Sequence, residues 1–316
     1  MRAIFGRLLV PIIALLTRPL SAQDLAPRAY VITPTGSNAI NLTWSYYNGG
    51  VDFNGAIPIS GATGVFSVPT FSYYHSFRFF GRSANVAAGL PYGVGTFQGE
   101  LLQQHQSVYR SGLLDSTVRF SVNLLGGPAM HFPQFLKWKQ KALLGASLKI
   151  VVPTGQYDPQ KLVNWGINRW AFKPELGYSQ RWGKWVLDGY AGVWFYTANH
   201  AYFDRPVPTT QTEAPIGSFE GHFSHDFKPG TWVSLDGNFW WGGVTSLSGI
   251  RNLATRQTGS RLGATVAFRV AAHHSIKVTY SDGTYLRFGS NYHNLQVGWQ
   301  YSWLGWSLHQ KRAHGD

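Results

Sequence analysis

The ionisable side chains of this chain of 316 residues are few and regularly spaced. Asp, Glu, Lys and Arg make up 13% of it, whereas a soluble globular domain usually carries about 25%. Many of them alternate with apolar residues, and a β-strand places alternating positions on its two opposite faces. Charges gathered on one such face and turned towards water could orient polar solutes and select among ions.

The alternation assigns these charges to two groups on the wet face. In a closed cylinder the groups would form opposed walls, so that alanine at Arg119 and Arg261 would change ion selectivity. A ladder of salt bridges that fills and stiffens the interior is the alternative, and it stays equally open. The basic wall comprises Arg78, Arg119, Lys149, Lys173, Arg261, Arg269 and Lys277, and the acidic wall comprises Asp188, Glu220, Asp226 and Asp236.

A second group of side chains could contact a solute. The stretch from Pro153 to Trp170 is rich in turn and aromatic residues, so it could fold inward, or it could be an outer loop held by its own contacts. Aromatic residues on the wet face could form a track for a ring-bearing ligand or simply fill space. The candidates for solute contact are Tyr157, Trp165, Asn168, Arg169, Tyr74, Tyr190 and Trp194.

Signals for enzymatic chemistry are missing from the sequence. It has no Gly-x-Ser-x-Gly elbow, no His-Glu-x-x-His pair and no phosphate-binding loop. His222 and His225 are three residues apart, so on one strand they point to opposite faces and cannot share a metal. We therefore predict no catalytic residues, no metal site and no cofactor.

The elements that carry these side chains are strands. A period of two recurs in twelve segments, with one face suited to hydrocarbon. Long connections alternate with short ones, which is how membrane barrels are built, except that residues 126–140 include a predicted short helix from Pro133 to Lys141. The segments are 38–48, 66–80, 83–92, 115–125, 141–152, 169–181, 184–198, 212–227, 231–242, 258–270, 274–283 and 292–304.

An open sheet in hydrocarbon would leave an edge of unpaired backbone groups, so the sheet must close. The fold prediction is therefore all-β: a closed, antiparallel, up-and-down transmembrane β-barrel of about twelve strands, with both ends on the periplasmic side. Aromatic residues fall near the strand ends, as expected of girdles at the two membrane interfaces. They are Trp44, Tyr46, Phe77, Phe79, Trp182, Trp185, Phe195, Phe227, Trp232, Trp240, Trp241 and Trp303.

The start of the chain indicates export. Arginines, the apolar run Leu8 to Leu16 and the small-residue site Leu20-Ser21-Ala22 are typical of a signal peptide, here residues 1–22. The apolar run is too short for a membrane-spanning helix, which needs about 20 residues. The remaining predicted parts are a short periplasmic segment (23–37), the barrel (38–304) and a C-terminal tail (305–316).

Composition narrows the class further. The chain has no cysteine, so an exported form cannot rely on disulfides. Its formal net charge of +13 is spread out with no nucleic-acid motif, so we predict no nucleic-acid partner. The predicted location is the outer membrane of a Gram-negative bacterium, with the lipid bilayer, lipopolysaccharide and a small solute as partners.

Three stretches resemble a known family, the outer-membrane transporters labelled "MetA-pathway of phenol degradation". They are DLAPRAY at Asp24–Tyr30, DSTVRFSVN at Asp115–Asn123, and the run from Val152 to Tyr178 that includes VPTGQYDP and NRWAFKPELGY. The resemblance implies an outer-membrane porin or transporter for small, often aromatic, compounds, and it supplies no catalytic residues. The last strand also resembles the signal read by the barrel assembly machinery, with Gln296, Gly298, Tyr301 and Trp303 in place.

We therefore expect an outer-membrane channel or transporter for small solutes, phenolic or otherwise aromatic. A closed structural or adhesive barrel whose outer loops bind a partner is the main alternative. A barrel enzyme acting on lipids is a minor one.

Overall fold

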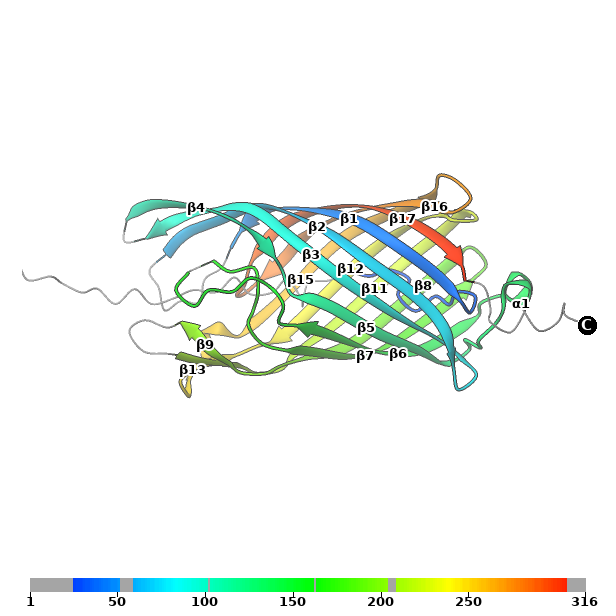
Figure 1. Ribbon diagram of the computed structural model, residues 1–316, viewed down its shortest axis with the longest axis horizontal. Helices are drawn as coiled ribbons and strands as arrows, with labels where there is room; N and C mark the ends of the chain where they lie inside the picture. Colours follow the sequence, from blue (N-terminus) through cyan, green and yellow to red (C-terminus); the bar gives the residue numbers. More distant parts are fainter. Residues whose placement is uncertain (1–24, 52–58, 102, 162, 204–208, 306–316) are drawn as a thin grey trace, which may run out of the picture.

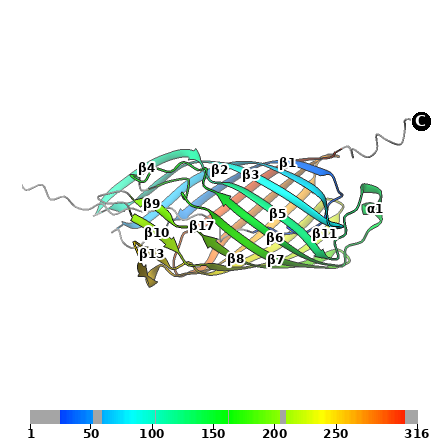
Figure 2. The same cartoon turned by 60° about the horizontal axis from the view of Figure 1, so that its bottom comes forward.

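Twelve antiparallel strands form a closed barrel in the computed structural model (Figures 1 and 2), which describes residues 25–51, 59–101, 103–161, 163–203 and 209–305. Each of the twelve predicted segments overlaps one of these strands, so the fold prediction is confirmed. The barrel strands are β1 (Ser37–Gly50), β2 (Ile59–Phe79), β3 (Arg82–Leu101), β5 (Ser116–Leu125), β6 (Ala142–Val152), β7 (Ala171–Trp182), β8 (Trp185–Tyr196), β11 (Ile216–Lys228), β12 (Thr231–Gly242), β15 (Gln257–Arg269), β16 (His274–Leu286) and β17 (Asn291–Leu304).

The barrel closes between its first and last strands. The pairing of β1 with β17 runs from Ser37 opposite Leu304 to Gly50 opposite Asn291. Because every barrel strand then has a neighbour on each side, its backbone N–H and C=O groups are paired within the sheet. Among the described residues, no helix is long and apolar enough to cross a membrane.

The two ends of the barrel differ. At one end, which we call the turn end, short connections join the strands, and the chain leaves β17 there (Figure 1). The opposite end, the loop end, carries the long connections. In membrane barrels the turn end is periplasmic and the loop end is outside the cell.

Several predicted loops at the loop end are partly strand. β2 and β3 have 21 and 20 residues, and β4 (Gln104–Leu113) pairs with the outer part of β3. A second, smaller sheet contains β9 (Asn199–Phe203), β10 (Thr209–Glu213), β13 (Thr245–Leu247) and β14 (Ile250–Asn252), followed by the short 3-10 helix η2 (Leu253–Thr255). These strands lack the regular apolar face of a lipid-facing strand, so alternation does not predict them.

The long connection at the turn end contains the helix α1 (Phe132–Lys137). It begins one residue earlier and ends four residues sooner than the predicted helix, and none of its residues is buried. The backbone N–H of His131 donates to the Gln134 side chain, which fixes the start of the helix. The small helix was therefore predicted in type but too long.

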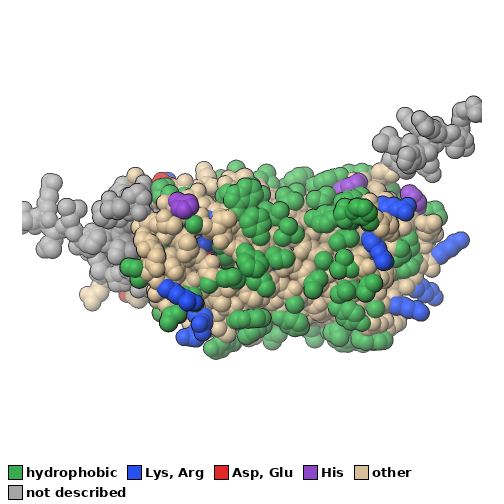
Figure 3. Space-filling model, turned by 90° about the horizontal axis from the view of Figure 1, so that it is seen from below, with side chains coloured by type: hydrophobic (Ala, Val, Ile, Leu, Met, Phe, Trp, Pro, Cys, Tyr) green, Lys and Arg blue, Asp and Glu red, His purple; other side chains and the backbone are tan. Residues whose placement is uncertain are grey.

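The outward faces of the strands are apolar, with Leu42, Phe71 and Leu235 all exposed. Figure 3 shows hydrophobic side chains along the whole face seen there, with several Lys and Arg side chains at the turn end. Two residues of the predicted aromatic girdles instead face inward: Trp240 is 1% exposed, and Trp232 lies under Arg28. Trp232 and Trp240 occupy even-numbered positions of β12, as do the inward-facing residues Ser234 and Asp236. The alternation along the strand therefore places both tryptophans inside the barrel, and the girdle assignment did not take this into account.

The lumen contains part of the chain before β1. Residues 25–36, which we call the strap, lie inside the barrel, seen in blue between its walls in Figure 1. From the sequence we expected residues 23–37 to form a short periplasmic N-terminal segment. The strap differs because its side chains find partners on the inner wall: Tyr30 and Ile32 are 1% and 2% exposed. The predicted signal peptide and residues 306–316 of the predicted tail lie outside the described residues.

Candidate functional site: a lumen with a charged side and an uncharged side

The charged side of the lumen is a ladder of ion pairs that runs from β5 through β7 and β11 to β12. Lys173 Nζ lies 2.6 Å from Glu175 Oε2 and 3.0 Å from Glu220 Oε1. His222 lies beyond Glu220, with Nδ1 2.9 Å from Asp236 Oδ1, and Arg119 stands 3.7 Å from Glu175 at the other end. We call these six residues the charge ladder. Its acids and bases alternate side by side and do not face each other across the lumen.

The strap is fixed to this charged side at two points. The first is near the turn end, where Arg28 Nη1 donates to Asp226 Oδ1 over 2.7 Å and its other nitrogens donate to Ser224 Oγ. The Arg28 guanidinium also stacks over the Trp232 ring at 4.4 Å, and Arg181 donates to the second oxygen of Asp226. Asp226 is thus held by two arginines, one from the strap and one from the wall.

The second point is a slot for the Tyr30 ring. Gly145 on β6 and Gly177 on β7 are directly paired, and a β-carbon at either position would overlap the ring. The Tyr30 hydroxyl donates to Glu175 Oε1 at 2.9 Å and lies 3.0 Å from Ser147 Oγ. Two glycines therefore make room that one strap residue fills.

Three predicted solute-contacting residues lie on barrel strands, Tyr190 and Trp194 on the charged side and Tyr74 on β2. The Tyr190 hydroxyl accepts the backbone N–H of Ala29, and the Tyr74 hydroxyl hydrogen-bonds Thr33 at 2.8 Å, so both hold the strap. Trp194 is fully buried, with the ammonium groups of Lys149 and Lys173 at 5.6 and 5.7 Å from its ring. Tyr190 and Tyr74 therefore hold the strap, and Trp194 is a packing residue of the charged side.

The opposite side of the lumen is almost uncharged. We call the inward faces of β16, β17, β1 and β2 the polar lane, since small hydroxyl and amide side chains dominate them. Its residues include Ser275, Lys277, Thr279, Gln296, Gln300, Asn41, Thr43, Ser45, Thr70 and Ser72. Lys277 is the single charged member of this set.

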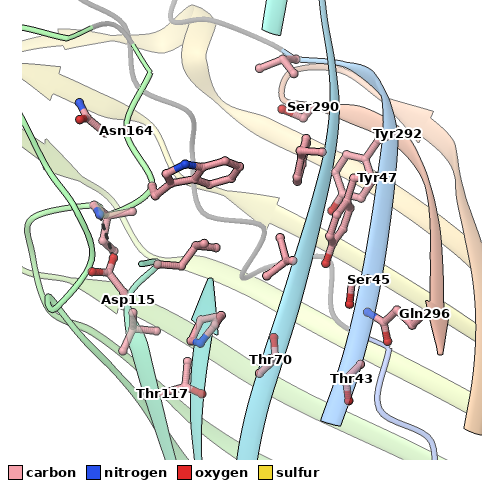
Figure 4. A pocket seen from close by; sticks show the side chains of 18 of the residues that line it. Thr43, Ser45, Tyr47, Thr70, Asp115, Thr117, Asn164, Ser290, Tyr292 and Gln296 are labelled. Carbon is pink, nitrogen blue, oxygen red and sulfur yellow. Dashed lines mark hydrogen bonds between the residues drawn. The ribbon is translucent and has the colours of Figure 1, made fainter. Parts of the chain in front are cut away.

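A cavity of 380 Å³ lies at the outer part of the lane (Figure 4). Its upper wall is aromatic: the rings of Tyr47 and Phe66 stack at 4.7 Å, and Phe97 and Trp165 pack edge-on at 5.7 Å. In Figure 4 the side chains of Tyr47 and Tyr292 lie together on one side, and Asp115 and Thr117 face them from the other. Hydroxyl and amide groups and one ammonium line its lower part: Thr43, Ser45, Thr70, Thr117, Gln296 and Lys149.

A second cavity of 520 Å³ lies at the turn end of the lane. Among the described residues that line it are Arg269, Lys277, His273 and His274, and none is Asp or Glu. Thr43 lines both cavities, so the aromatic outer cavity and the basic inner one lie next to each other along the lane.

The loop from Pro153 to Trp170 is held by its own contacts and by the small sheet of β9, β10, β13 and β14. Tyr157 donates to the backbone oxygen of Tyr202 at 2.7 Å, and burial raises the pKa of its hydroxyl to about 12. Asn168 donates to Asn199, and Arg169 pairs with Glu213 in a buried contact. Of the four predicted loop residues, Trp165 lines the outer cavity and the other three hold the loop.

Asp115 fixes this loop over the outer cavity. Its two carboxylate oxygens accept the backbone N–H groups of Gly155 and Ile167, both at 2.8 Å. Burial raises the pKa of the Asp115 carboxyl, and these two hydrogen bonds oppose the rise. Its role here is structural, since both oxygens are already occupied by the loop.

The other predicted lumen residues are dispersed. Arg261 is 1% exposed and stacks on the Tyr292 ring at 4.2 Å, whereas Arg78 is exposed at the turn end. Asp188 is 1% exposed on β8, opposite His222 in the strand register. No group of three or more His, Cys, Asp or Glu side chains that could hold a metal is found within the described ranges.

Sequence reasoning missed the strap and most of the aromatic outer wall. Tyr47, Phe66 and Phe97 all occupy those alternating positions of their strands that face the lumen. Phe66 was only the first residue of a predicted segment, and Phe97 was assigned to a loop. The signal that could have revealed the strap is the pair of inward glycines, Gly145 and Gly177, because such a gap in a filled lumen requires an occupant.

A closed barrel with an apolar outer face and a partly open polar lumen defines the class of outer-membrane channel-like barrels. The model of the family described as "Putative MetA-pathway of phenol degradation" matches residues 60–292, well over half of the chain. The chain therefore belongs to that family, and the resemblance noted in the sequence is confirmed.

Solved structures show the same fold. The COG4313 outer membrane channel from Pseudomonas putida F1 is similar with a TM-score of 0.72 and 16% identity, over 89% of this chain and 100% of that one. The transport unit of the autotransporter AIDA-I from Escherichia coli is similar with a TM-score of 0.51 and 12% identity, over 91% and 95% of the two chains. These identities support the fold alone. The search of curated proteins gives no match to this sequence.

Proposed function

We propose that this protein is a passive channel that carries small solutes across the outer membrane along the polar lane. The observation that carries the proposal is the position of Thr43, which lines both the outer and the inner cavity. The strap and the charge ladder fill the other side of the lumen, so the lane is the side that they leave to solutes.

We further propose that the preferred solutes are small organic anions that carry an aromatic ring. The aromatic upper wall of the outer cavity favours stacking with a planar ring. Lys277 and Arg269 line the inner cavity without an acidic neighbour among its lining residues, which favours anions. Phenolates and benzoates combine both properties, and the phenol-degradation label of the family agrees with this class.

Single-channel recording in planar bilayers tests the proposal, with the full-length mature protein and a salt gradient. We expect conductance steps and a reversal potential whose sign indicates selectivity for anions. We also expect faster liposome swelling in benzoate than in an uncharged sugar of similar size. Protein that inserts but gives neither conductance nor swelling would refute the channel.

The route has its own test, because the chain has no natural cysteine. Thr43→Cys should react with a membrane-impermeant, charged thiol reagent in the bilayer, and the conductance should fall. Leu42→Cys is the matched control, since the neighbouring side chain faces lipid and is 52% exposed there. If the modified Thr43→Cys protein conducts like the unmodified one, solutes do not follow the lane.

A closed structural barrel with a binding surface at the loop end is the second candidate. The observation in its favour is the small sheet of β9, β10, β13 and β14, which extends the barrel at that end. Bilayer recording separates the two, since a closed barrel gives no conductance. For either candidate we propose export through the signal peptide, insertion by the barrel assembly machinery and contact with lipopolysaccharide.

A further inference from the structure

The turn end of the barrel is strongly basic. Its connections and the strand ends beside them, residues 78–82, 126–141, 181–184, 226–230 and 269–274, contain nine Lys or Arg residues and one acid, Asp226. We call the nine the basic collar. They are Arg78, Arg82, Lys137, Lys139, Lys141, Arg181, Lys184, Lys228 and Arg269.

Asp226 neutralises only one member of this collar, Arg181. Both of its oxygens are occupied, one by Arg28 of the strap and one by Arg181. Lys137, Lys139 and Lys184 are exposed, and within the part of the chain that the structure describes none of them has an ion pair. Their charges are therefore available to a partner outside the chain.

Exposed apolar side chains lie at the same end. Phe80, at the tip of the turn between β2 and β3, is 90% exposed, and Leu136 on α1 is 67% exposed. Phe132 on the same helix is also exposed, and Phe135 stacks with Trp138 at 6.2 Å. Large apolar groups beside lysines are the composition of a surface that lies at a membrane interface.

We propose that the exposed lysines of the basic collar, with α1 as their main contact, bind the headgroups of anionic phospholipids in the periplasmic leaflet. Headgroup phosphates are the negative charges at the border of the apolar band, where the collar lies. Phe132 and Leu136 would enter the upper acyl region, while Lys137 and Lys139 reach the phosphates. The loop end has acids among its cations, namely Glu100, Asp158 and Asp282, so the same attraction is weaker there.

The test compares the binding of phosphatidylglycerol and phosphatidylcholine to the full-length mature protein in nanodiscs. Native mass spectrometry counts the lipids retained, and spin-labelled lipid gives their relative affinities. We expect the wild type to prefer phosphatidylglycerol, and high salt to weaken the preference. In the double variant K137Q/K139Q, the preference for phosphatidylglycerol over phosphatidylcholine should fall about five- to thirtyfold.

The matched control is K161Q/R251Q, which removes two exposed cations from the loop end. It should keep the full preference for phosphatidylglycerol. Both variants must retain the heat-sensitive gel mobility of a folded barrel, and the replaced side chains are all exposed, so folding is expected. Equal binding of the two lipids by the wild type overturns the proposal. So does an unchanged preference in K137Q/K139Q, or an equal loss in the control.

Discussion

Lys277 is the lumen residue whose replacement should have the clearest effect on ion selectivity. It is exposed to the inner cavity, and no carboxylate lies among the described residues that line that cavity. Lys277→Gln removes a full positive charge from the solute route while keeping a polar side chain of similar length. We expect the reversal potential in a salt gradient to move towards zero, by several millivolts at low salt, because screening is weakest there.

Lys184→Gln is the control for this prediction. It removes the same charge from a turn outside the lumen, so the reversal potential should stay unchanged. A Lys277→Gln channel with the wild-type reversal potential would show that the inner cavity does not filter ions.

Lys173 illustrates the opposite case, a lumen charge that serves stability. It is 5% exposed and bridges Glu175 and Glu220, so its removal leaves two buried carboxylates without their shared partner. Lys173→Met should lower the free energy of unfolding by about 3–5 kcal/mol. Urea unfolding in lipid vesicles, followed by tryptophan fluorescence, measures this effect, and a midpoint equal to that of wild type would contradict it.

The expectation for Arg119 and Arg261 changes with the structure. Arg119 belongs to the charge ladder, and Arg261 is buried against Tyr292. Neither is among the residues that line the two cavities. We now expect their replacement by alanine to affect stability more than ion selectivity, and Lys277 and Arg269 to carry the selectivity.

At the scale of elements, the strap sets how much of the lumen is open. Its attachment depends on the Arg28 ion pair and on the Tyr30 ring in its glycine slot. The double variant Arg28→Ala, Tyr30→Ala should release it from the charged side and raise the single-channel conductance. Loss of a buried aromatic ring also costs about 3–5 kcal/mol of stability.

Tyr46→Ala is the matched control for the strap, because it removes the same ring from the outward face of β1. Its conductance should equal that of wild type. If the double variant inserts and conducts like wild type, the strap does not narrow the route.

The strands were predictable wherever lipid imposes a pattern. β1, β12 and β17 alternate apolar and polar residues along their length, so their positions were predicted to within a few residues. The outer part of β3 and the whole of β4 lack this pattern, so alternation does not predict them. The strap has no period at all: its position depends on partners such as Glu175 and Asp226, which are 145 and 198 residues away in sequence.

The site was less predictable than the fold for the same reason. The alternation of side chains along each strand predicts which charged residues face inward. It does not predict their partners, because these depend on the stagger between strands. Lys173 and Glu220 meet across β8, 47 positions apart in the sequence. The choice between opposed walls and a salt-bridge ladder therefore required the structure.

At the scale of the whole molecule, the continuous pairing of the barrel strands predicts resistance to detergent. Folded protein in sodium dodecyl sulfate at room temperature should run as a compact band, and boiling should shift it to the position of the unfolded chain. The physical reason is that no barrel strand offers a free edge at which unfolding could begin. A single band of unchanged mobility before and after boiling would contradict closure.

The strap also constrains the order of events during assembly. It is joined directly to β1, and β1 forms its final pairing with β17, the last strand to be synthesised. Once that seam is sealed, Tyr30 would have to thread past the ladder to reach its slot. We therefore expect the strap to settle against β6 and β7 while the seam is open, acting as an internal template for the curvature of the growing sheet. Variants that weaken the strap should then insert more slowly, even where the finished barrel is sound.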